Sequence, residues 1–438
     1  MTTTGSSDTG PSTTGPRPVG PPPDGTPPAG PLTNWAGNLT FGARAVHRPR
    51  DLDELRELVR RSDRVRALGS GHSFSPVADT EGDLVRLDGL PTRIEIAPDR
   101  RSVTVSAATR YAELATVLHA AGLALENLAS LPHISVAGAT ATGTHGSGDT
   151  RRSLAAAVRS LEVVGADGEL RTTTHPGAVV HLGALGIVTA LTLDTVPAFD
   201  VRQYVHTGLA LADYTAHLDE IHAVGYSVSL FTDWGSDTGR VWVKQLDDGT
   251  PPAAVPGARP ADRPEHPVPG LPTDACTPQL GAPGPWYRRL PHFRPEFTPS
   301  SGAELQSEYL LPRAAARAAV AELRSLGQQL APVLHISEVR TVAADELWLS
   351  PSHGRDSVAF HFTWKPDPAA VAPALAAVER ALLPLGGRPH WGKITHAPRA
   401  AVGTAYERLG DFLALRRELD PDGKFANRFT EQLAGTAD

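Results

Sequence analysis

The sequence predicts an α+β fold, in which short strands alternate with helices, and it argues against a doubly wound parallel sheet. Short β-prone runs at 64–68 and 103–106 are separated by helical patterns in the first 200 residues. A hairpin pattern at 161–170, with Asp167-Gly168 as its turn, adds an antiparallel pair. Further strand patterns and Ala- and Leu-rich helical patterns follow after residue 200. Such a mixture is typical of the α+β class.

The elements of the first 200 residues are expected as follows. A helix covers 51–61, because Leu52, Leu55, Leu58 and Val59 recur on one helical face. A strand at 64–68 follows and leads into a glycine-rich loop at 69–74. A strand at 103–106, a helix at 111–121, the hairpin and a glycine-punctuated strand over 182–193 complete this part.

The second half of the chain is expected to combine strands, helices and one long irregular excursion. Strands are predicted at 226–232, 333–342 and 357–364, and helices at 312–330 and 368–385. Residues 249–300 are Pro-rich, and a free linker would lack their four aromatic residues. We therefore predict an ordered excursion over the second domain, anchored by Trp286, Tyr287, Phe293 and Phe297.

Composition limits the classes of protein to consider. The 438 residues provide enough chain for two or three domains, and the net charge of −7 gives no indication of nucleic-acid or anionic-membrane binding. A single cysteine, Cys276, excludes an internal disulfide and a multi-cysteine zinc site, and it fits a reducing compartment. Residues 1–33 resemble a disordered tail rather than a secretory signal. We expect no metal and no membrane span, and a cytoplasmic monomer.

The loop Gly69-Ser70-Gly71-His72-Ser73-Phe74 is the first candidate binding element. Two glycines one residue apart allow a tight turn that presents several backbone N–H groups to one point. Such a nest binds phosphate without a cation. The alternative is a surface turn with an incidental histidine.

A second stretch, 129–148, consists almost entirely of small, hydroxylic or absent side chains. A backbone of this kind suits close contact with a long, flat, polar ligand. The alternative is a flexible linker, although Leu131, Ile134 and Val136 are interleaved. Polar groups for the ligand would come from Ser130, Ser135, Thr142, Thr144 and His145.

Three familiar motifs are absent or incomplete. Residues 387–393 have the Gly-x-x-x-x-Gly-Lys spacing of a phosphate loop, but Ile394 replaces the magnesium-binding Ser/Thr and Pro389 interrupts the loop. The 69–74 loop lacks the third glycine of the Rossmann fingerprint. The sequence also lacks a His-Glu-x-x-His motif. We therefore exclude an NTPase, a nicotinamide enzyme of that type and a zincin.

Two predicted strands carry polar residues on one face. Alternation along 334–342 places Glu338 and Arg340 on one face with Leu334 and Ile336. Opposite charges on an apolar face are unfavourable unless they are paired or functional, and the alternative is a buried structural ion pair. Along 358–364, His361 and Thr363 lie opposite to Phe360 and Phe362. For His361 the alternative is a satisfied core histidine.

Together, the 69–74 loop and the run Ser130-Leu-Pro-His-Ile-Ser-Val-Ala-Gly138 with Gly143-Thr-His-Gly-Ser-Gly148 resemble the FAD-binding half of the vanillyl-alcohol oxidase (VAO) superfamily. Within it, the sequence is most similar to the alditol (xylitol) oxidases, from about Asn34 to Phe429. The resemblance implies a two-domain VAO/PCMH-type FAD-binding fold with an α/β substrate (cap) domain over the flavin. The run 419–427 resembles the C-terminal signature of these flavoproteins. The expected parts are a 1–33 tail, a 34–199 FAD domain, a 200–388 substrate domain and a 389–438 segment that returns to the FAD domain.

The resemblance also implies the site residues. FAD would be bonded covalently through His72. Its other contacts would come from Ala67, Leu68, Gly69, Ser70, Gly71, Ser73, Ser130, Ser135, Gly138, Thr142, Gly143, Thr144, His145, Val188 and His390. The polyol contacts would be Ser130, Glu338, Arg340, Thr363 and Lys393. The catalytic residues would be Arg340, Lys393, Glu338 and His361, of which Lys393 and His361 both stay open as the acceptor of the hydroxyl proton.

The implied reaction is oxidation of the terminal primary alcohol of polyols such as xylitol and sorbitol, with O2 reduced to hydrogen peroxide. Arg340 and Lys393 would be the fixed cations that stabilise developing negative charge. The first alternative is an aldonolactone oxidase or a polyol dehydrogenase of the same fold. The second is a non-enzymatic carbohydrate-binding protein, which would be colourless.

Overall fold

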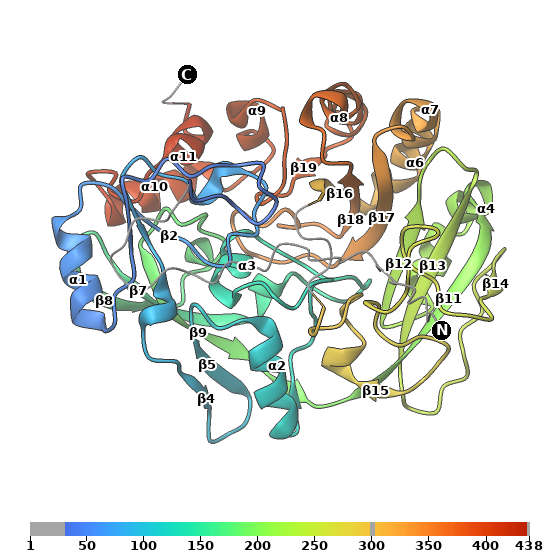
Figure 1. Cartoon of the computed structure of the whole chain (residues 1–438), viewed down its shortest axis with the longest axis horizontal. Helices are drawn as coiled ribbons and strands as arrows, with labels where there is room; N and C mark the ends of the chain where they lie inside the picture. The colour runs from blue at the N-terminus through green and yellow to red at the C-terminus, as the bar shows by residue number, and fades with distance from the viewer. Residues whose placement is uncertain (1–30, 298–302, 436–438) are drawn as a thin grey trace, which may run out of the picture.

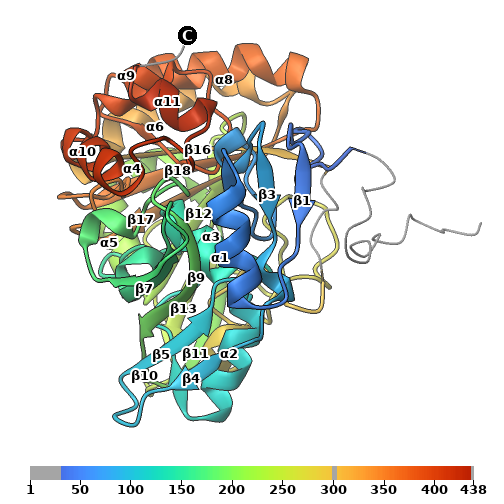
Figure 2. The same cartoon turned by 90° about the vertical axis from the view of Figure 1, so that its left-hand side faces the viewer.

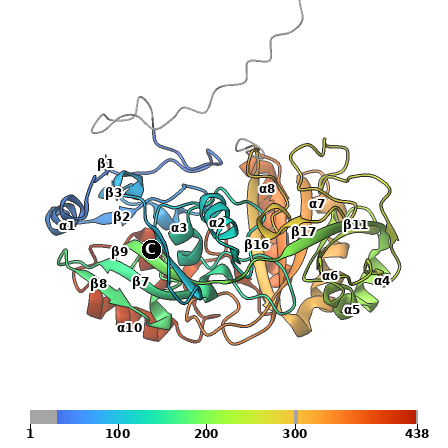
Figure 3. The same ribbon diagram turned by 90° about the horizontal axis from the view of Figure 1, so that it is seen from below.

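The computed structural model describes residues 31–297 and 303–435, which form two halves side by side (Figure 1). Figure 3 shows α1, β7 and β8 in one half and β11, α4 and α5 in the other. The expected tail at 1–33 lies almost wholly outside the described residues. None of the described helices combines the length and the apolar composition that a membrane crossing requires.

The first half contains two small sheets. A parallel three-stranded sheet has the order β1-β3-β2, and an antiparallel five-stranded sheet has the order β4-β5-β9-β7-β8. Figure 2 shows α1 beside β1 and β3. The strands are β1 (Ala45–His47), β2 (Val65–Ala67), β3 (Asp83–Val85), β4 (Ile94–Ile96), β5 (Ser102–Ser106), β7 (Val158–Val164), β8 (Leu170–Thr173) and β9 (Ile187–Asp194), with a separate pair β6 (Leu123–Ala124) and β10 (Val196–Pro197). The helices are α1 (Leu52–Arg61), α2 (Tyr111–Ala120) and α3 (Val136–Ala141).

The second half is one nine-stranded sheet with the order β14-β11-β13-β12-β17-β18-β16-β19, in which β15 also pairs with β11. Helices α4–α8 pack against one face of this sheet through a shared apolar cluster. The strands are β11 (Asp200–Ala210), β12 (Ser227–Thr232), β13 (Thr238–Leu246), β14 (Arg259–Pro260), β15 (Gly284–Pro285), β16 (Leu305–Pro312), β17 (Leu334–Val342), β18 (Ser357–Trp364) and β19 (Arg388–Pro389). The helices are α4 (Leu211–Ala216), α5 (Leu218–Ala223), α6 (Ala316–Ser325), α7 (Gly327–Leu330) and α8 (Pro368–Leu382).

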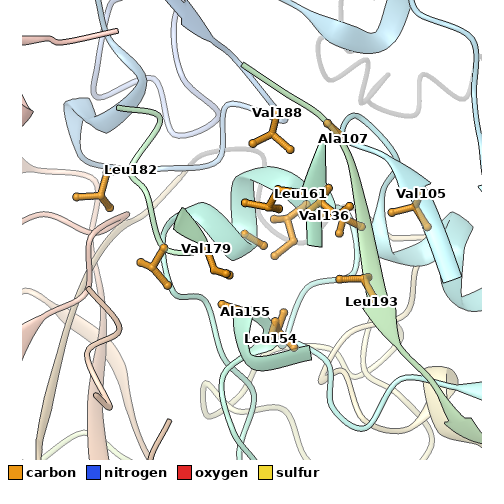
Figure 4. Close-up of a cluster of buried hydrophobic side chains, with 14 of the residues drawn as sticks. Val105, Ala107, Val136, Leu154, Ala155, Leu161, Val179, Leu182, Val188 and Leu193 are labelled. Atoms are coloured by element: carbon orange, nitrogen blue, oxygen red, sulfur yellow. The ribbon is translucent and has the colours of Figure 1, made fainter. Parts of the chain in front are cut away.

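The C-terminal residues pack into the apolar core of the first half. This core contains Val136, Leu161 and Val188, which Figure 4 shows in one cluster, and also Trp391 and Phe425. The helices of this segment are α9 (Arg399–Gly403), α10 (Leu409–Leu419) and α11 (Arg428–Leu433). The core of the first half is therefore completed by residues from the other end of the chain.

Most of the predicted elements are confirmed, with three corrections. The strand predicted over 182–193 begins only at Ile187. The helix predicted over 312–330 is divided into a 3-10 turn at Arg313–Ala315, α6 and α7. Leu334 does not share a face with Ile336, because the register of β17 against β18 shifts between them. Leu334 therefore packs in the helix-side cluster, whereas Ile336 belongs to a small cluster with Phe231 and Trp242. A bulge changes which residues share a face, and the sequence pattern did not reveal it.

The excursion at 249–297 is ordered, as expected, and pairs with β11 through β14 and β15. Trp286 anchors it deep in the first core, and Phe293 packs against the cluster around Trp242. Phe297 is 40% exposed, so its predicted role as an anchor was wrong. The excursion therefore lies against both halves, and its final residues reach the space between them.

Candidate active site

A cavity of about 610 Å³ lies between the two halves. The walls from the first half come from the loop after β2, from 129–145 around α3, and from residues near the start of β9. The opposite wall is the sheet face not covered by helices α4–α8. Among the predicted site residues, the cavity is lined by Ala67, Leu68, Gly69, Ser70, Gly71, His72, Ser73, Ser130, Ser135, Gly138, Thr142, Thr144, His145, Val188, Glu338, Arg340, His361, Thr363, His390 and Lys393.

Gly143 is the one predicted site residue that does not line this cavity. Its φ of +67° is a left-handed conformation that favours glycine, and a Cβ atom there would meet Pro351 at 3.0 Å. Gly143 therefore serves the turn after α3 rather than the cavity wall.

The glycine-rich loop is held directly against the start of α3. A Cβ atom on Gly69 would lie 2.4 Å from Ser135 Oγ, so any other residue there would displace either this hydroxyl or the loop. The backbone N–H of Ser70 donates to Ser135 Oγ at 3.3 Å, and the Ser135 N–H donates to Ser70 Oγ at 3.3 Å. Gly71 supplies the left-handed turn with φ +65°. Two chain segments 65 residues apart thus form one continuous wall of backbone and small side chains.

His72 lies on this wall beside an aromatic cluster. Its ring centroid is 4.5 Å from that of Trp35 and 6.1 Å from that of Phe74. Burial, assisted by the charge of Lys393, lowers the pKa of His72 to about 3. The imidazole is therefore neutral near pH 7 and keeps a nitrogen lone pair for a covalent bond.

The residues of this wall fit a flavin dinucleotide. The position that a Cβ atom of Gly138 would fill is 2.8 Å from Ser135 Oγ, so Gly69 and Gly138 both leave room for this hydroxyl. The N–H groups of such a loop suit a diphosphate, and the small residues around α3 leave room for a flat ring system.

A buried ionic cluster occupies the sheet side of the cavity. Arg340 on β17 donates through Nη2 to Glu308 Oε1 on β16 and through Nη1 to Ser130 Oγ at 3.4 Å. Its Nε lies 3.7 Å from Glu338 Oε1, and His145 Nε2 lies 3.3 Å from Glu308 Oε1. The direct partner of Arg340 is therefore Glu308, and Glu338 is a more distant neighbour.

Both carboxylates are charged despite their burial. Burial alone would raise the pKa of Glu308, but the adjacent Arg340 and His145 hold it well below the usual range. Likewise, Arg340 and His292 outweigh burial and keep the pKa of Glu338 low. Burial opposes the charge of Arg340, but the two carboxylates raise its pKa above the ordinary value. The cluster thus holds a fixed guanidinium between two carboxylates in a site of low polarity.

A second group of hydrogen bonds centres on Gln306 of β16. Its Nε2 donates to Glu304, and its Oε1 accepts from Lys393 Nζ and lies 3.2 Å from His361 Nε2. Burial, with the charge of Lys393 next, lowers the pKa of His361 to about 3. Burial lowers the pKa of Lys393 to about 8. Near pH 7 this group therefore combines a neutral histidine with a protonated lysine.

The sequence patterns did not identify Gln306, Glu308, His292 and Lys244. Gln306 and Glu308 alternate along β16, so the same period-2 argument that selected Glu338 could have selected them. His292 lies in the excursion, and no local pattern marks it. His145, Glu308 and His390 could each offer one atom to a metal ion, and these atoms lie within 4.8 Å of one another. Glu308 already accepts a hydrogen bond from the positively charged Arg340, which argues against a metal ion there.

Comparisons with known proteins agree with this geometry. The model of an FAD binding domain matches residues 43–174, which contain the glycine-rich loop and α3, and the model of D-arabinono-1,4-lactone oxidase matches residues 303–433. The fold resembles the crystal structure of cholesterol oxidase from B. sterolicum, with a TM-score of 0.72 at 15% identity over 95% of this chain and 100% of that chain. The chain thus has the α+β VAO/PCMH flavoprotein fold that the sequence predicted.

Two curated relatives cover nearly the whole chain. L-gulono-1,4-lactone dehydrogenase of Mycobacterium tuberculosis is 30% identical over 436 residues, which cover 92% of this chain and 99% of that protein. Alditol oxidase of a Streptomyces species is 54% identical over 411 residues, which cover 92% of this chain and 98% of that protein. With the cofactor wall and the ionic cluster in place, these matches show that the chain belongs to the alditol oxidase family of FAD-dependent oxidoreductases.

Proposed function

We propose that this oxidoreductase oxidises the terminal primary alcohol of alditols, such as xylitol and sorbitol, to the aldose and reduces O2 to hydrogen peroxide. The observation that carries the proposal is the row of polar groups on the sheet side of the cavity, opposite a wall suited to FAD. Ser130, Arg340 and Glu338 lie at one end of this row and Lys393 at the other. A row of this kind has partners for several hydroxyl groups.

FAD, when bound, supplies an acceptor for the hydride that leaves the alcohol carbon and then passes the electrons to O2. We propose that His72 holds it covalently, since its imidazole is neutral and lies on the loop that the cofactor contacts. The remaining contacts are assigned to the loop 67–73, to the small residues of 129–145 that line the cavity, and to Val188 and His390.

We propose His361 as the transient acceptor of the proton of the reacting hydroxyl, because its pKa of about 3 keeps the ring neutral near pH 7 and makes it release that proton readily. Gln306 Nε2 donates to Glu304, so its Oε1 faces Lys393 and His361 and can only accept. The Nε2 of His361 must then carry the hydrogen, and Nδ1 of the neutral ring keeps a lone pair for the proton. Lys393 is protonated near pH 7 and therefore donates rather than accepts.

Arg340 and Lys393 are assigned to the negative charge that develops on the substrate oxygen as the proton and hydride leave. Arg340 is held from two sides by buried carboxylates, so it needs little reorganisation when that charge appears. Thr363 and Ser130 provide hydroxyl groups for the rest of the polyol.

We also propose that 34–199 forms the FAD domain, 200–388 the substrate domain and 389–438 a segment returning to the FAD domain. The packing of Trp391 and Phe425 in the first core supports the return. A cytoplasmic monomer completes the proposal, and the net charge of −7 supports the absence of nucleic-acid and anionic-membrane partners.

The alternative to this proposal is a lactone oxidase or a dehydrogenase. It is worth testing because the model of D-arabinono-1,4-lactone oxidase matches residues 303–433. Purified protein with a flavin absorption spectrum should release hydrogen peroxide with xylitol and sorbitol, and more slowly with glycerol. Each hydroxyl missing from a shorter substrate leaves a buried polar group unpaired, which costs about 1–3 kcal/mol of binding free energy. Faster turnover of aldonolactones, or flavin reduction without peroxide release, would contradict the proposal.

A further inference from the structure

Lys244 is a buried cation that the proposed reaction does not use. It lies on β13, is 1% exposed, and is not among the described residues that line the cavity. Its Nζ donates to the carbonyl oxygens of Leu290 and Pro291, the latter at 3.2 Å, and lies 3.1 Å from Nδ1 of His292. Burial lowers the pKa of Lys244 to about 7, and in its protonated form the ammonium group has three N–H donors for these three acceptors.

This contact determines the tautomer of His292. Burial, and next the charge of Lys244, lowers the pKa of His292 to about 4, so the ring is neutral and carries one hydrogen. Because Nδ1 accepts from Lys244, the hydrogen is on Nε2, which lies 2.8 Å from Glu338 Oε1. The ring is packed between Phe231 and Trp242, with centroid distances of 5.4 and 5.3 Å, so its plane is fixed as well.

The consequence concerns the two oxygens of Glu338. Oε1 accepts from His292 and lies 3.7 Å from Arg340 Nε, whereas Oε2 accepts no hydrogen bond from any residue that the structure describes. Glu338 lines the cavity, so a donor in the cavity can reach this carboxylate. We propose that Lys244 and His292 are positioning residues that hold Oε1 of Glu338 and thereby present Oε2 to a hydroxyl group of the polyol.

This inference rests on the proposed function, because it assigns a polyol hydroxyl to Glu338. The inference adds a series of contacts that runs from Lys244 in the interior of the second half through His292 to Glu338 and the substrate. These contacts determine affinity for the polyol rather than the rate of the chemical step. Loss of a hydrogen bond to a charged group corresponds to about a ten-fold change or more in a binding constant.

The variants His292→Phe and Lys244→Met test the positioning role in the flavin-loaded protein. Each keeps the approximate volume of the side chain and removes its contacts. We expect the KM for xylitol to rise at least about ten-fold, with the anaerobic flavin-reduction rate at saturating xylitol within about three-fold of wild type. A KM within two-fold of wild type in both variants would overturn the inference, whatever happens to the melting temperature.

Thr277→Val is the matched control. The Thr277 hydroxyl donates to the carbonyl oxygen of Pro291 at 2.9 Å, so it supports the same backbone segment as Lys244 without contacting the His292 ring. We expect this variant to lower the melting temperature while the KM for xylitol stays within two-fold of wild type. An equal rise in KM for Thr277→Val would mean that the segment matters only as scaffold, and the inference would then be wrong.

A spectroscopic measurement tests the contacts from Lys244 through His292 to Glu338 without any substrate. In wild-type protein labelled with nitrogen-15 in histidine, two-bond correlation spectra report the tautomer, and comparison with His292→Phe assigns the ring. We expect hydrogen on Nε2 and none on Nδ1 at pH 7. Hydrogen on Nδ1 would overturn the inference whatever KM values the variants show. If wild-type flavin is not reduced by xylitol, the proposed function fails, whereas the tautomer still decides whether Lys244 and His292 hold Glu338.

Discussion

The two walls of the cavity recognise their ligands by different means. The stretches 67–73 and 129–145 contain no Asp, Glu, Lys or Arg, and they offer backbone N–H groups, hydroxyls and close packing. The opposite wall instead carries the paired and buried Glu308, Glu338 and Arg340, together with the half-buried Lys393. The first wall therefore depends on shape, and the second on charge. Substitutions that add atoms should therefore impair binding at the first wall, and substitutions that remove a charge should impair the second.

The largest effect is expected for Arg340→Ala on the charged wall. Loss of a donor aimed at developing charge should slow flavin reduction by xylitol roughly 10²–10³-fold, with a smaller change in KM. It would also leave the buried Glu308 with His145 as its remaining close partner, so the melting temperature should fall. Anaerobic stopped-flow reduction measures the rate.

Arg340→Lys is the control for this prediction. It keeps the charge but loses the planar fork that contacts both Glu308 and Ser130, so we expect an intermediate rate. A folded Arg340→Ala protein with a near-normal reduction rate and only a lowered melting temperature would assign Arg340 to the scaffold.

Gly69→Ala should damage the uncharged wall by shape alone. The new methyl group would lie 2.4 Å from Ser135 Oγ, so it would displace this hydroxyl from the Ser70 N–H or push the loop away from α3, and flavin content per chain should fall by more than half. Gly71→Ala is the matched control, because nothing lies within 4 Å of its Cβ position. It should lose only about 1–2 kcal/mol of stability through its left-handed backbone. Equal flavin loss in both variants would contradict the shape argument.

His72→Ala separates covalent attachment from binding. We expect the variant to retain FAD through the backbone wall, while flavin fluorescence disappears from the denatured protein band. Fluorescence that persists on the His72→Ala chain would show that another residue forms the bond. Loss of all flavin absorbance before denaturation would show instead that the backbone wall is insufficient.

The smallest effect is a pH dependence from Lys393. Its lowered pKa of about 8 means that it is charged below that pH and loses its proton above it. The flavin-reduction rate should therefore be level from pH 6 to about 7.5 and fall above about pH 8. Lys393→Arg keeps the charge and should remove this decrease. A decrease at the same pH in the Arg variant would assign the titration to another group.

The sequence was sufficient to predict the positions of residues that follow a local periodicity. Alternation along β17 and β18 correctly placed Glu338 and Arg340 together on one face with Ile336, and His361 and Thr363 opposite Phe360. The glycine-rich loop was visible because its residue types are unusual over a short span. The predicted face of Leu334 was wrong because a bulge shifts the register of β17, and an alternating sequence pattern does not reveal a bulge.

Partners that are distant in sequence could not be inferred in this way. Arg340 and Glu308 meet because β16 and β17 both pair with β18, and an alternating pattern does not state the order of strands in a sheet. The excursion was expected to cover the second domain, but its pattern could not show that His292 would reach Glu338. Charge pairing inside the cavity is therefore a property of topology rather than of any single segment.

The return of the C-terminal segment has a consequence for the order in which the protein is built. Arg66, directly before the glycine-rich loop, donates to the carbonyl oxygen of Phe425 at 2.6 Å, and the Val65 N–H donates to that of Lys424 at 2.9 Å. These contacts join residues 359 positions apart in the chain. During translation β2 therefore lacks these two contacts until residues 424 and 425 have left the ribosome. A polypeptide that ends before residue 424 should accordingly retain less flavin than the full chain, although the loop still contacts α3.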